Sequence, residues 1–270
     1  SYKYGETGLT RNNAFNLSST SGTIYNYFYY MNAANFRNNT IKMNSTTGTI
    51  YGCYDYNYYS SNTAVSTIAY NTFDARSSSG GTVYAYYNAG TPVAGAEYVS
   101  NLFTTNTSGT SYLLYPTANA GADMKFIHNT FHSNSTGTIN YLVYTPAGSS
   151  SYPGKYILTN NIFSRLNNNG TAVYRGDTTY NKADYNLYYS GGGAQTFQCG
   201  NPAVTTTSLQ TWRTGGFDRN SLTYDPGFVS PATYDFRPNA ANANAWSVNG
   251  RGTHLTNDTM DIAGNVRPRT

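Results

Sequence analysis

The chain places hydrophobic and polar residues alternately over short segments and separates these segments with Asn, Gly, Ser and Thr. Segments 66–70, 125–128 and 155–158 have the short alternating pattern of a β-strand with one buried face. No stretch of useful length has hydrophobic residues at the i, i+3, i+4, i+7 spacing of an amphipathic helix. The pattern therefore predicts an all-β protein built from many short strands.

A triplet of the form Asn-x-(Phe/Ile/Tyr) recurs seven times, at intervals of 25 to 32 residues. The triplets begin at Asn13, Asn39, Asn71, Asn101, Asn129, Asn161 and Asn186. Eight to ten residues after each of the first six Asn comes a Gly-Thr pair, and a Tyr follows that pair closely. These tyrosines are Tyr25, Tyr51, Tyr84, Tyr112, Tyr141 and Tyr174. The Asn triplet and the Gly-Thr pair recur together in six successive segments, which indicates a structural repeat that contains about three strands.

A strand-only repeat of this length predicts a right-handed parallel β-helix with one coil per repeat, because a propeller blade needs about 40 residues. We expect about seven recognisable coils over residues 1–189, an irregular loop region over 190–224, and a C-terminal coil or cap region over 225–270. A cap is needed because the last coil would otherwise expose strand edges and an apolar end.

The triplet predicts a tight corner between two strands. We expect its Asn to adopt the left-handed backbone conformation, and the stacked Asn amides to hydrogen-bond from coil to coil as a ladder. The Phe or Ile two residues later should point into the core. After each Gly-Thr pair, Ile24, Ile50 and Val83 should face the core, while the neighbouring Thr and Tyr face outward. In the fifth and sixth coils the Tyr lies one position later, which predicts a bulge.

The tyrosines form the most suggestive surface, with 29 in 270 residues. Exposed aromatic side chains stack on sugar rings or apolar surfaces, and their hydroxyls form hydrogen bonds, so Tyr25, Tyr51, Tyr84 and Tyr112 are candidate ligand-binding residues. The same rows would also stabilise the stack of coils through ring packing, and the two roles are compatible. Further tyrosines expected on this face are Tyr27, Tyr29, Tyr30, Tyr54, Tyr56, Tyr58, Tyr59, Tyr86 and Tyr87.

Composition narrows the class of protein. Only 10% of the residues are charged, against about 25% in an average soluble domain, and 16% are aromatic, which argues against a disordered linker. No apolar run approaches the ~20 residues of a membrane-spanning helix, so we expect no membrane insertion. The net charge of +4 is scattered without a basic cluster, so we expect no nucleic-acid partner.

Candidate catalytic chemistry is sparse. Hydrolases and lyases of β-helix fold need converging carboxylates, or a base with Arg or Ca²⁺, but the 12 acidic residues are dispersed along the chain. We therefore expect no catalytic residues, no metal and no cofactor. The densest polar group is Arg175, Asp177, Tyr180, Lys182 and Asp184. It is either a small lyase-like site, with Arg175, Lys182 and Asp184 as its active groups, or a solvated loop with local ion pairs.

Aligning the triplets places His132 in one column with residues from six other coils. The other members of this column are Asn16, Lys42, Asp74, Thr104, Ser164 and Tyr189. We expect the column to be exposed, with a surface ion pair between Lys42 and Asp74 in adjacent coils. Cys53 and Cys199 lie about five coils apart, too far for a disulfide unless the region after residue 190 folds back.

Residues 183–270 carry an ordered series of motifs. They are Ala183-Asp-Tyr-Asn-Leu-Tyr-Tyr189, Ser208-Leu-x-x-Trp212, Gly216-Phe-Asp-x-Asn-Ser221, Asp225-Pro-x-Phe-Val229, Asp235-Phe-Arg237 and Asp261-Ile-x-Gly-Asn-x-Arg-Pro268. The series resembles the C-terminal part of right-handed parallel β-helix repeat proteins of the Bacteroidota secreted and cell-surface type. That resemblance implies a piece of a larger modular polypeptide, exported by the type IX secretion system to the cell surface or beyond it. Family members often end in an Ile-Gly-Ala-Tyr-Glu-like strand, and this chain stops at Thr270, just short of it.

Together these observations predict a non-catalytic extracellular β-helix segment that serves as a stalk and adhesive surface. Its Tyr/Thr/Asn-rich faces would bind polysaccharide or another cell-surface ligand, and its other partners would be domains of the same polypeptide or the secretion machinery. The alternative is a polysaccharide lyase or glycoside hydrolase of β-helix fold. A flat, uncharged aromatic sheet would favour adhesion, whereas a carboxylate or Arg/Lys cluster in a cleft would favour the enzyme.

Overall fold

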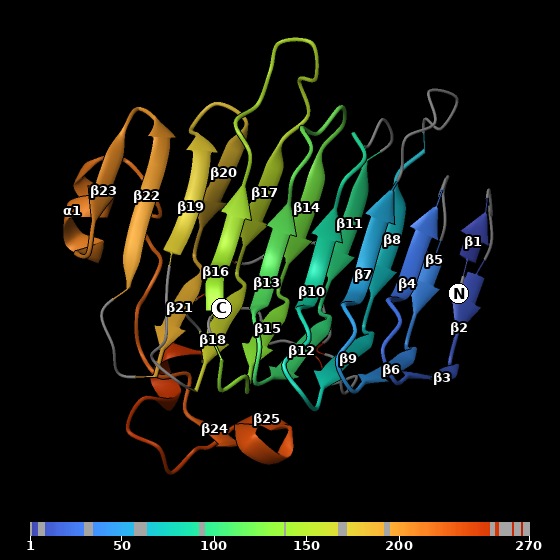
Figure 1. Cartoon of the computed structure of the whole chain (residues 1–270). Coiled ribbons are helices and arrows are strands. Elements are labelled where there is room, and N and C mark those ends of the chain that lie inside the picture. The colour runs from blue at the N-terminus through green and yellow to red at the C-terminus, as the bar shows by residue number, and fades with distance from the viewer. Residues whose placement is uncertain are drawn as a thin grey trace.

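The computed structural model describes residues 2–4, 9–29, 35–56, 64–91, 95–137, 139–166, 172–191, 195–248, 252–253, 261 and 266. Its strands stack into three sheets that form a parallel β-solenoid of about six turns (Figure 1). The prediction of an all-β protein with stacked parallel coils is confirmed. The right-handed sense of the coil stays a prediction.

Each coil adds one strand to each sheet. Sheet A contains β1 (Tyr2–Tyr4), β4 (Ile24–Tyr29), β7 (Ile50–Tyr56), β10 (Val83–Asn88), β13 (Ser111–Pro116), β16 (Ile139–Thr145), β19 (Ala172–Asp177), β22 (Thr196–Asn201) and β23 (Val204–Thr206). Sheet B contains β2 (Leu9–Arg11), β5 (Asn35–Arg37), β8 (Ser66–Ala69), β11 (Ala96–Val99), β14 (Met124–Ile127), β17 (Tyr156–Thr159) and β20 (Asn181–Asp184). Sheet C contains β3 (Ala14–Ser19), β6 (Thr40–Ser45), β9 (Thr72–Ser77), β12 (Leu102–Thr107), β15 (Thr130–Ser133), β18 (Ile162–Arg165) and β21 (Leu187–Ser190).

The core is built from columns of equivalent side chains in successive coils. Phe73, Phe103, Phe131 and Phe163 stack in sheet C with ring centroids 4.5 to 5.0 Å apart. All four are buried, as the triplet predicts, and each burial contributes roughly 1.5–3 kcal/mol to stability. On the sheet A side, Ile24, Ile50 and Val83 form the equivalent buried column, which confirms their predicted inward orientation.

The corner between sheets B and C differs from the prediction in one respect. The left-handed residue is not the triplet Asn but the residue before it, with φ between 53° and 59° in all seven corners. These residues are Asn12, Asn38, Tyr70, Ser100, His128, Asn160 and Tyr185. The left-handed residue turns the chain, and the next side chain, the triplet Asn, then lies at the corner where it reaches the neighbouring coil.

The seven triplet Asn residues form an amide ladder. Each Nδ2 donates to Oδ1 of the Asn one coil later, at 2.9 to 3.1 Å, over the whole row from Asn13 to Asn186. The backbone N–H of each Asn donates to the same Oδ1, as Asn101 does to Asn129 at 2.9 Å. At the end of the row the backbone N–H of Asn186 donates to Ser221 Oγ instead, at 2.9 Å. Ser221 therefore terminates the ladder.

Residues 190–224 lack the repeat marker, yet they extend and close the solenoid. Strand β22 pairs in parallel with β19, and β23 turns back antiparallel to β22. Helix α1 (Leu209–Thr214) follows, and Ser208 caps it by accepting a hydrogen bond from the Thr211 backbone N–H. The helix places Trp212, fully buried, between Phe197 of the last coil and Phe217, with ring centroids 5.6 and 4.0 Å away. This segment covers the C-terminal end of the core (Figure 1).

The next segment takes a different course. Strands β24 (Phe228–Ser230) and β25 (Asp235–Pro238) form an antiparallel pair around the 3-10 helix η1 (Pro231–Thr233), and η2 (Ala245–Ser247) follows. In Figure 1 the β24–β25 pair lies below the strands of sheet C, and its side chains contact that sheet. No helix within the described residues is both long and apolar enough to span a membrane.

Candidate functional site

Sheet A carries two parallel rows of outward tyrosines, which we call the tyrosine face. The first row is Tyr25, Tyr51, Tyr84, Tyr112 and Tyr141. The second row is Tyr27, Tyr54, Tyr87, Tyr115, Tyr144 and Tyr174. In β7, β10, β13 and β16 the two tyrosines are three residues apart, because two consecutive buried residues lie between them and shift the alternation by one.

The rings within each row stack on one another. In the first row, Tyr51 lies 4.9 Å from Tyr25 and 4.8 Å from Tyr84, both with interplanar angles of 2°. The rows also contact each other, as Tyr51 and Tyr54 do at 5.1 Å and 76°. The ring faces are thus largely covered by neighbouring tyrosines, so sugar stacking along the rows is restricted. The face presents ring edges and hydroxyls instead, and Tyr25, 43% exposed, is its most accessible ring.

The structure places some predicted members of this face elsewhere. The prediction for Tyr86 is wrong: it is fully buried and packs edge-on against Tyr98 and Phe126 in the core. Tyr30, Tyr58 and Tyr59 lie outside the described residues, as does the side chain of Tyr29. Sequence reasoning missed Tyr115 and Tyr144, although the spacing Tyr-x-x-Tyr in four successive coils carried the signal.

The tyrosine face is uncharged at neutral pH. Partial burial, followed by the neighbouring phenols, raises the pKa of Tyr51, Tyr54, Tyr84, Tyr115 and Tyr144 above the ordinary value. A phenolate within a row would be poorly solvated and would repel any second phenolate beside it. These five phenols therefore remain neutral well into the alkaline range.

This shift predicts loss of stability at alkaline pH. The unfolded phenol ionises near pH 10, whereas the raised pKa of Tyr84 keeps it neutral in the fold. The stabilisation is thus complete below about pH 10 and is lost as the pH rises towards the folded-state value. Urea unfolding between about pH 8 and pH 11 should show a steep fall above pH 10. Tyr84→Phe, which keeps the ring but cannot ionise, should show a smaller fall; an unchanged fall would contradict the argument.

The candidate catalytic group does not converge. Arg175 is 3% exposed and forms a buried ion pair with Asp218, so it does not belong to a solvated loop. Asp184 accepts hydrogen bonds from the backbone N–H and side-chain amide of Asn220, at 2.7 and 2.8 Å. Lys182 donates to the Thr178 carbonyl. Each of these three side chains has a separate local partner, so the three do not converge on one substrate-binding site.

No metal or thiol chemistry is apparent in the part of the chain that the structure describes. Within it, no three His, Cys, Asp or Glu side chains converge as a metal site would require. Cys53 and Cys199 are both buried and free, and burial raises the pKa of each thiol. A neutral buried thiol is a poor nucleophile.

The His132 column keeps its predicted register, but its middle members are buried, so the prediction of an exposed column is wrong. The β24–β25 segment packs against His132, whose ring lies 4.9 Å from that of Phe236. Burial lowers the pKa of His132 to about 4, so the imidazole is neutral at neutral pH. Asp74 forms its ion pair with Arg76, two residues along the same strand, and not the predicted one with Lys42.

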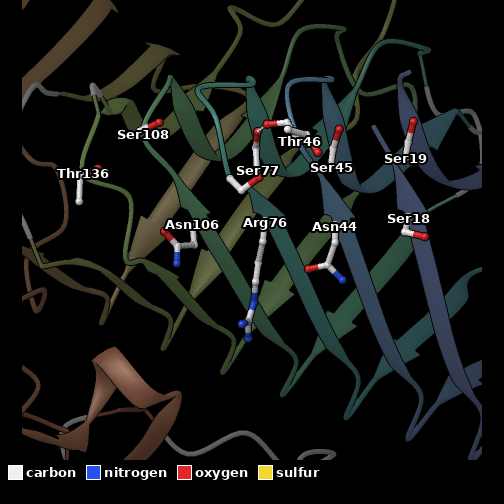
Figure 2. A pocket seen from close by; sticks show the side chains of 11 residues that line it. Ser18, Ser19, Asn44, Ser45, Thr46, Arg76, Ser77, Asn106, Ser108 and Thr136 are labelled. Carbon is white, nitrogen blue, oxygen red and sulfur yellow. Dashed lines mark hydrogen bonds between the residues drawn. The ribbon is translucent and has the colours of Figure 1, made fainter. Parts of the chain in front are cut away.

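A groove of about 600 Å³ follows the outer face of sheet C towards the corner with sheet A (Figure 2). Its lining residues are Ser18, Ser19, Asn44, Ser45, Thr46, Arg76, Ser77, Ser78, Asn106, Ser108 and Thr136. In Figure 2 the long side chain of Arg76 extends from its strand between the shorter Asn44 and Asn106. Hydroxyls and amides make up the rest of the lining, so the groove is a polar surface with one guanidinium.

No family model, curated protein or solved structure matches this chain. Functional assignment therefore depends on the geometry of its own surfaces, chiefly the tyrosine face and the groove on sheet C.

Proposed function

We propose that this β-solenoid is a non-catalytic binding module of an extracellular surface protein, and that its tyrosine face attaches to polysaccharide or to a polysaccharide-coated surface. The observation that carries the proposal is the pair of stacked tyrosine rows on sheet A, which contain no charged side chain. An aromatic surface without carboxylates suits adhesion better than hydrolysis or elimination.

The mechanism would be multivalent contact. Successive strands repeat every ~4.8 Å, so the phenol hydroxyls form a regular array along the solenoid axis. Each hydroxyl contributes a weak hydrogen bond and each ring edge a small apolar contact. Because stacking already restricts the rings, little side-chain entropy is lost on binding. Many weak contacts with one extended polymer then add up to a useful affinity.

The proposed setting follows from the motifs of residues 183–270. Their resemblance to β-helix repeat proteins of the Bacteroidota secreted type supports export by the type IX system and membership of a larger modular polypeptide. In that setting the solenoid would act as a stalk that holds its adhesive face away from the cell. Its other partners would be neighbouring domains or the secretion machinery.

The proposal predicts retention without turnover on insoluble polysaccharides. Wild type should bind at least one polysaccharide of an array and release neither unsaturated nor reducing ends. The triple variant Tyr51→Phe/Tyr84→Phe/Tyr112→Phe keeps the stacked rings but removes three hydroxyls. Three lost hydrogen bonds at about 0.5 kcal/mol each should weaken binding about tenfold.

A matched control alters outward residues of sheet B instead. The double variant Glu97→Ala/Lys125→Ala removes a half-exposed ion pair with an Nζ–Oε1 distance of 2.9 Å and should leave retention unchanged. Failure of wild type to bind any polysaccharide on the array would overturn the adhesive proposal. Product release would overturn its non-catalytic part.

A further inference from the structure

The groove on sheet C contains a guanidinium held in one orientation. Arg76 Nε donates to Asp74 Oδ1 and Oδ2 at 3.0 and 2.9 Å, and Arg76 Nη2 lies 2.7 Å from Oδ2. Asp74 is itself buried and accepts a hydrogen bond from Thr104 Oγ1 at 2.9 Å. The Arg76 side chain nevertheless remains 41% exposed. Asp74 thus holds one edge of the planar Arg76 guanidinium, and the other edge stays accessible to a ligand.

The C-terminal segment supplies an aromatic wall above this guanidinium. The Tyr234 ring centroid lies 4.0 Å from the guanidinium carbon of Arg76, which is a close cation–π contact. Asn106 Nδ2 donates to the Tyr234 hydroxyl at 3.4 Å. Asn134 Nδ2 holds the preceding turn by donating to the Pro231 carbonyl at 2.9 Å. Strands that are distant in sequence therefore converge on one aromatic residue beside the groove.

Tyr234 occupies this place in a left-handed backbone conformation, with φ 65° and ψ 27°. A bulky residue rarely adopts that conformation, and glycine would do so without strain. In this conformation the Tyr234 ring lies over the Arg76 guanidinium.

The lining indicates the charge of the ligand. None of the eleven lining residues is acidic, and the single cation, Arg76, is already neutralised by Asp74. Asn44, Arg76 and Asn106 are register partners in neighbouring strands, so their polar groups repeat every ~4.8 Å along the solenoid axis. Repeated hydroxyl and amide groups, an ion-paired Arg and one aromatic ring match an uncharged polymer rich in hydroxyl groups.

We propose that this groove is a second binding site, distinct from the tyrosine face, which takes a segment of a neutral polysaccharide chain extended along the solenoid axis. The outer edge of Arg76 and the side chains of Asn44 and Asn106 hydrogen-bond its hydroxyls, and Tyr234 borders the site as an aromatic wall. The two sites lie on different sheets, so the tyrosine face can attach to a polysaccharide surface while the groove holds a separate chain segment.

The test uses soluble hexasaccharides together with variants of the groove residues, which separate this groove from the tyrosine face. Isothermal titration calorimetry with cellohexaose, xylohexaose, mannohexaose and the acidic hexagalacturonate should show binding of at least one neutral hexasaccharide, with little dependence on salt. Asn44→Ala/Asn106→Ala should weaken that binding by about fivefold or more, as expected for the loss of one or two neutral hydrogen bonds. The Glu97→Ala/Lys125→Ala variant, altered on sheet B and outside both binding surfaces, should bind the hexasaccharide as wild type does.

Tyr234→Gly separates binding from folding. Glycine relieves the positive φ, which offsets part of the stability lost with the ring contacts, so the variant should stay folded while losing about fivefold or more in affinity. Wild-type affinity in this variant and in the Asn44/Asn106 variant would overturn the proposal. Absence of binding to every neutral hexasaccharide, or tighter and salt-sensitive binding of hexagalacturonate, would also overturn it.

Discussion

Replacing Asn129 with alanine is expected to lower the free energy of unfolding by about 3–5 kcal/mol. Asn129 Oδ1 accepts from the backbone N–H and Nδ2 of Asn101, at 2.9 and 3.0 Å. Its Nδ2 donates to the Tyr98 carbonyl and to Asn161 Oδ1, at 2.8 and 3.1 Å. Alanine leaves several of these buried groups without a partner, and each one costs about 1–3 kcal/mol. Urea unfolding followed by circular dichroism measures the loss.

The matched control is the first ladder residue. Asn13 is exposed and its Nδ2 donates to the Arg11 carbonyl and to Asn39 Oδ1. Water can replace these bonds, so Asn13→Ala should cost about 1 kcal/mol or less. Equal losses for Asn13→Ala and Asn129→Ala would show that burial does not govern the strength of the ladder, contrary to the argument.

Replacing Asp218 with alanine should open the C-terminal cap, at a cost of about 3–5 kcal/mol. The Asp218 carboxylate pairs with Arg175 and accepts hydrogen bonds from Trp212 Nε1 at 2.9 Å and Ser221 Oγ at 2.9 Å. Its removal leaves the Arg175 charge buried without a counter-ion beside the last coil. Thermal unfolding gives the stability. In a Trp246→Phe background, fluorescence of Trp212 reports exposure of the cap.

Two further variants check the cause. Asp218→Ala/Arg175→Met removes the stranded charge together with its partner and should recover part of the lost stability. Asp235→Ala breaks an exposed ion pair with Arg237 and should leave the unfolding midpoint unchanged. If the double variant were less stable than Asp218→Ala alone, the buried charge would not be the source of the loss.

The repeat was predictable because its markers have a chemical signature. The Asn side chain supplies an amide that both donates and accepts along the ladder, and the hydrophobic residue two positions later is buried in almost every coil. By contrast, the left-handed corner position is occupied by Asn, Tyr, Ser or His. Because these residues share no sequence pattern, the left-handed conformation was predicted for the neighbouring triplet Asn instead.

The tyrosine face was only half predictable for a similar reason. Strict alternation places residues three apart on opposite faces, but consecutive buried residues such as Leu113 and Leu114 shift the phase. Because of this shift, alternation wrongly predicts Tyr86 on the outer face of sheet A and does not predict Tyr115 there. Contacts across long sequence separations were also invisible: nothing local indicates that Arg175 meets Asp218, or that Phe236 covers His132.

The amide ladder has a consequence for how such a molecule can change over generations. Each interior ladder Asn bonds to its equivalents one coil before and one coil after, and its Nδ2 also donates to a backbone carbonyl of the preceding coil. The same groups make these bonds in every interior coil. A DNA segment that encodes one full coil, from one Asn to the next, can therefore be duplicated or deleted without altering the joints that remain. Recombination can lengthen or shorten the rod in steps of one coil, and the number of tyrosines along its face changes with it.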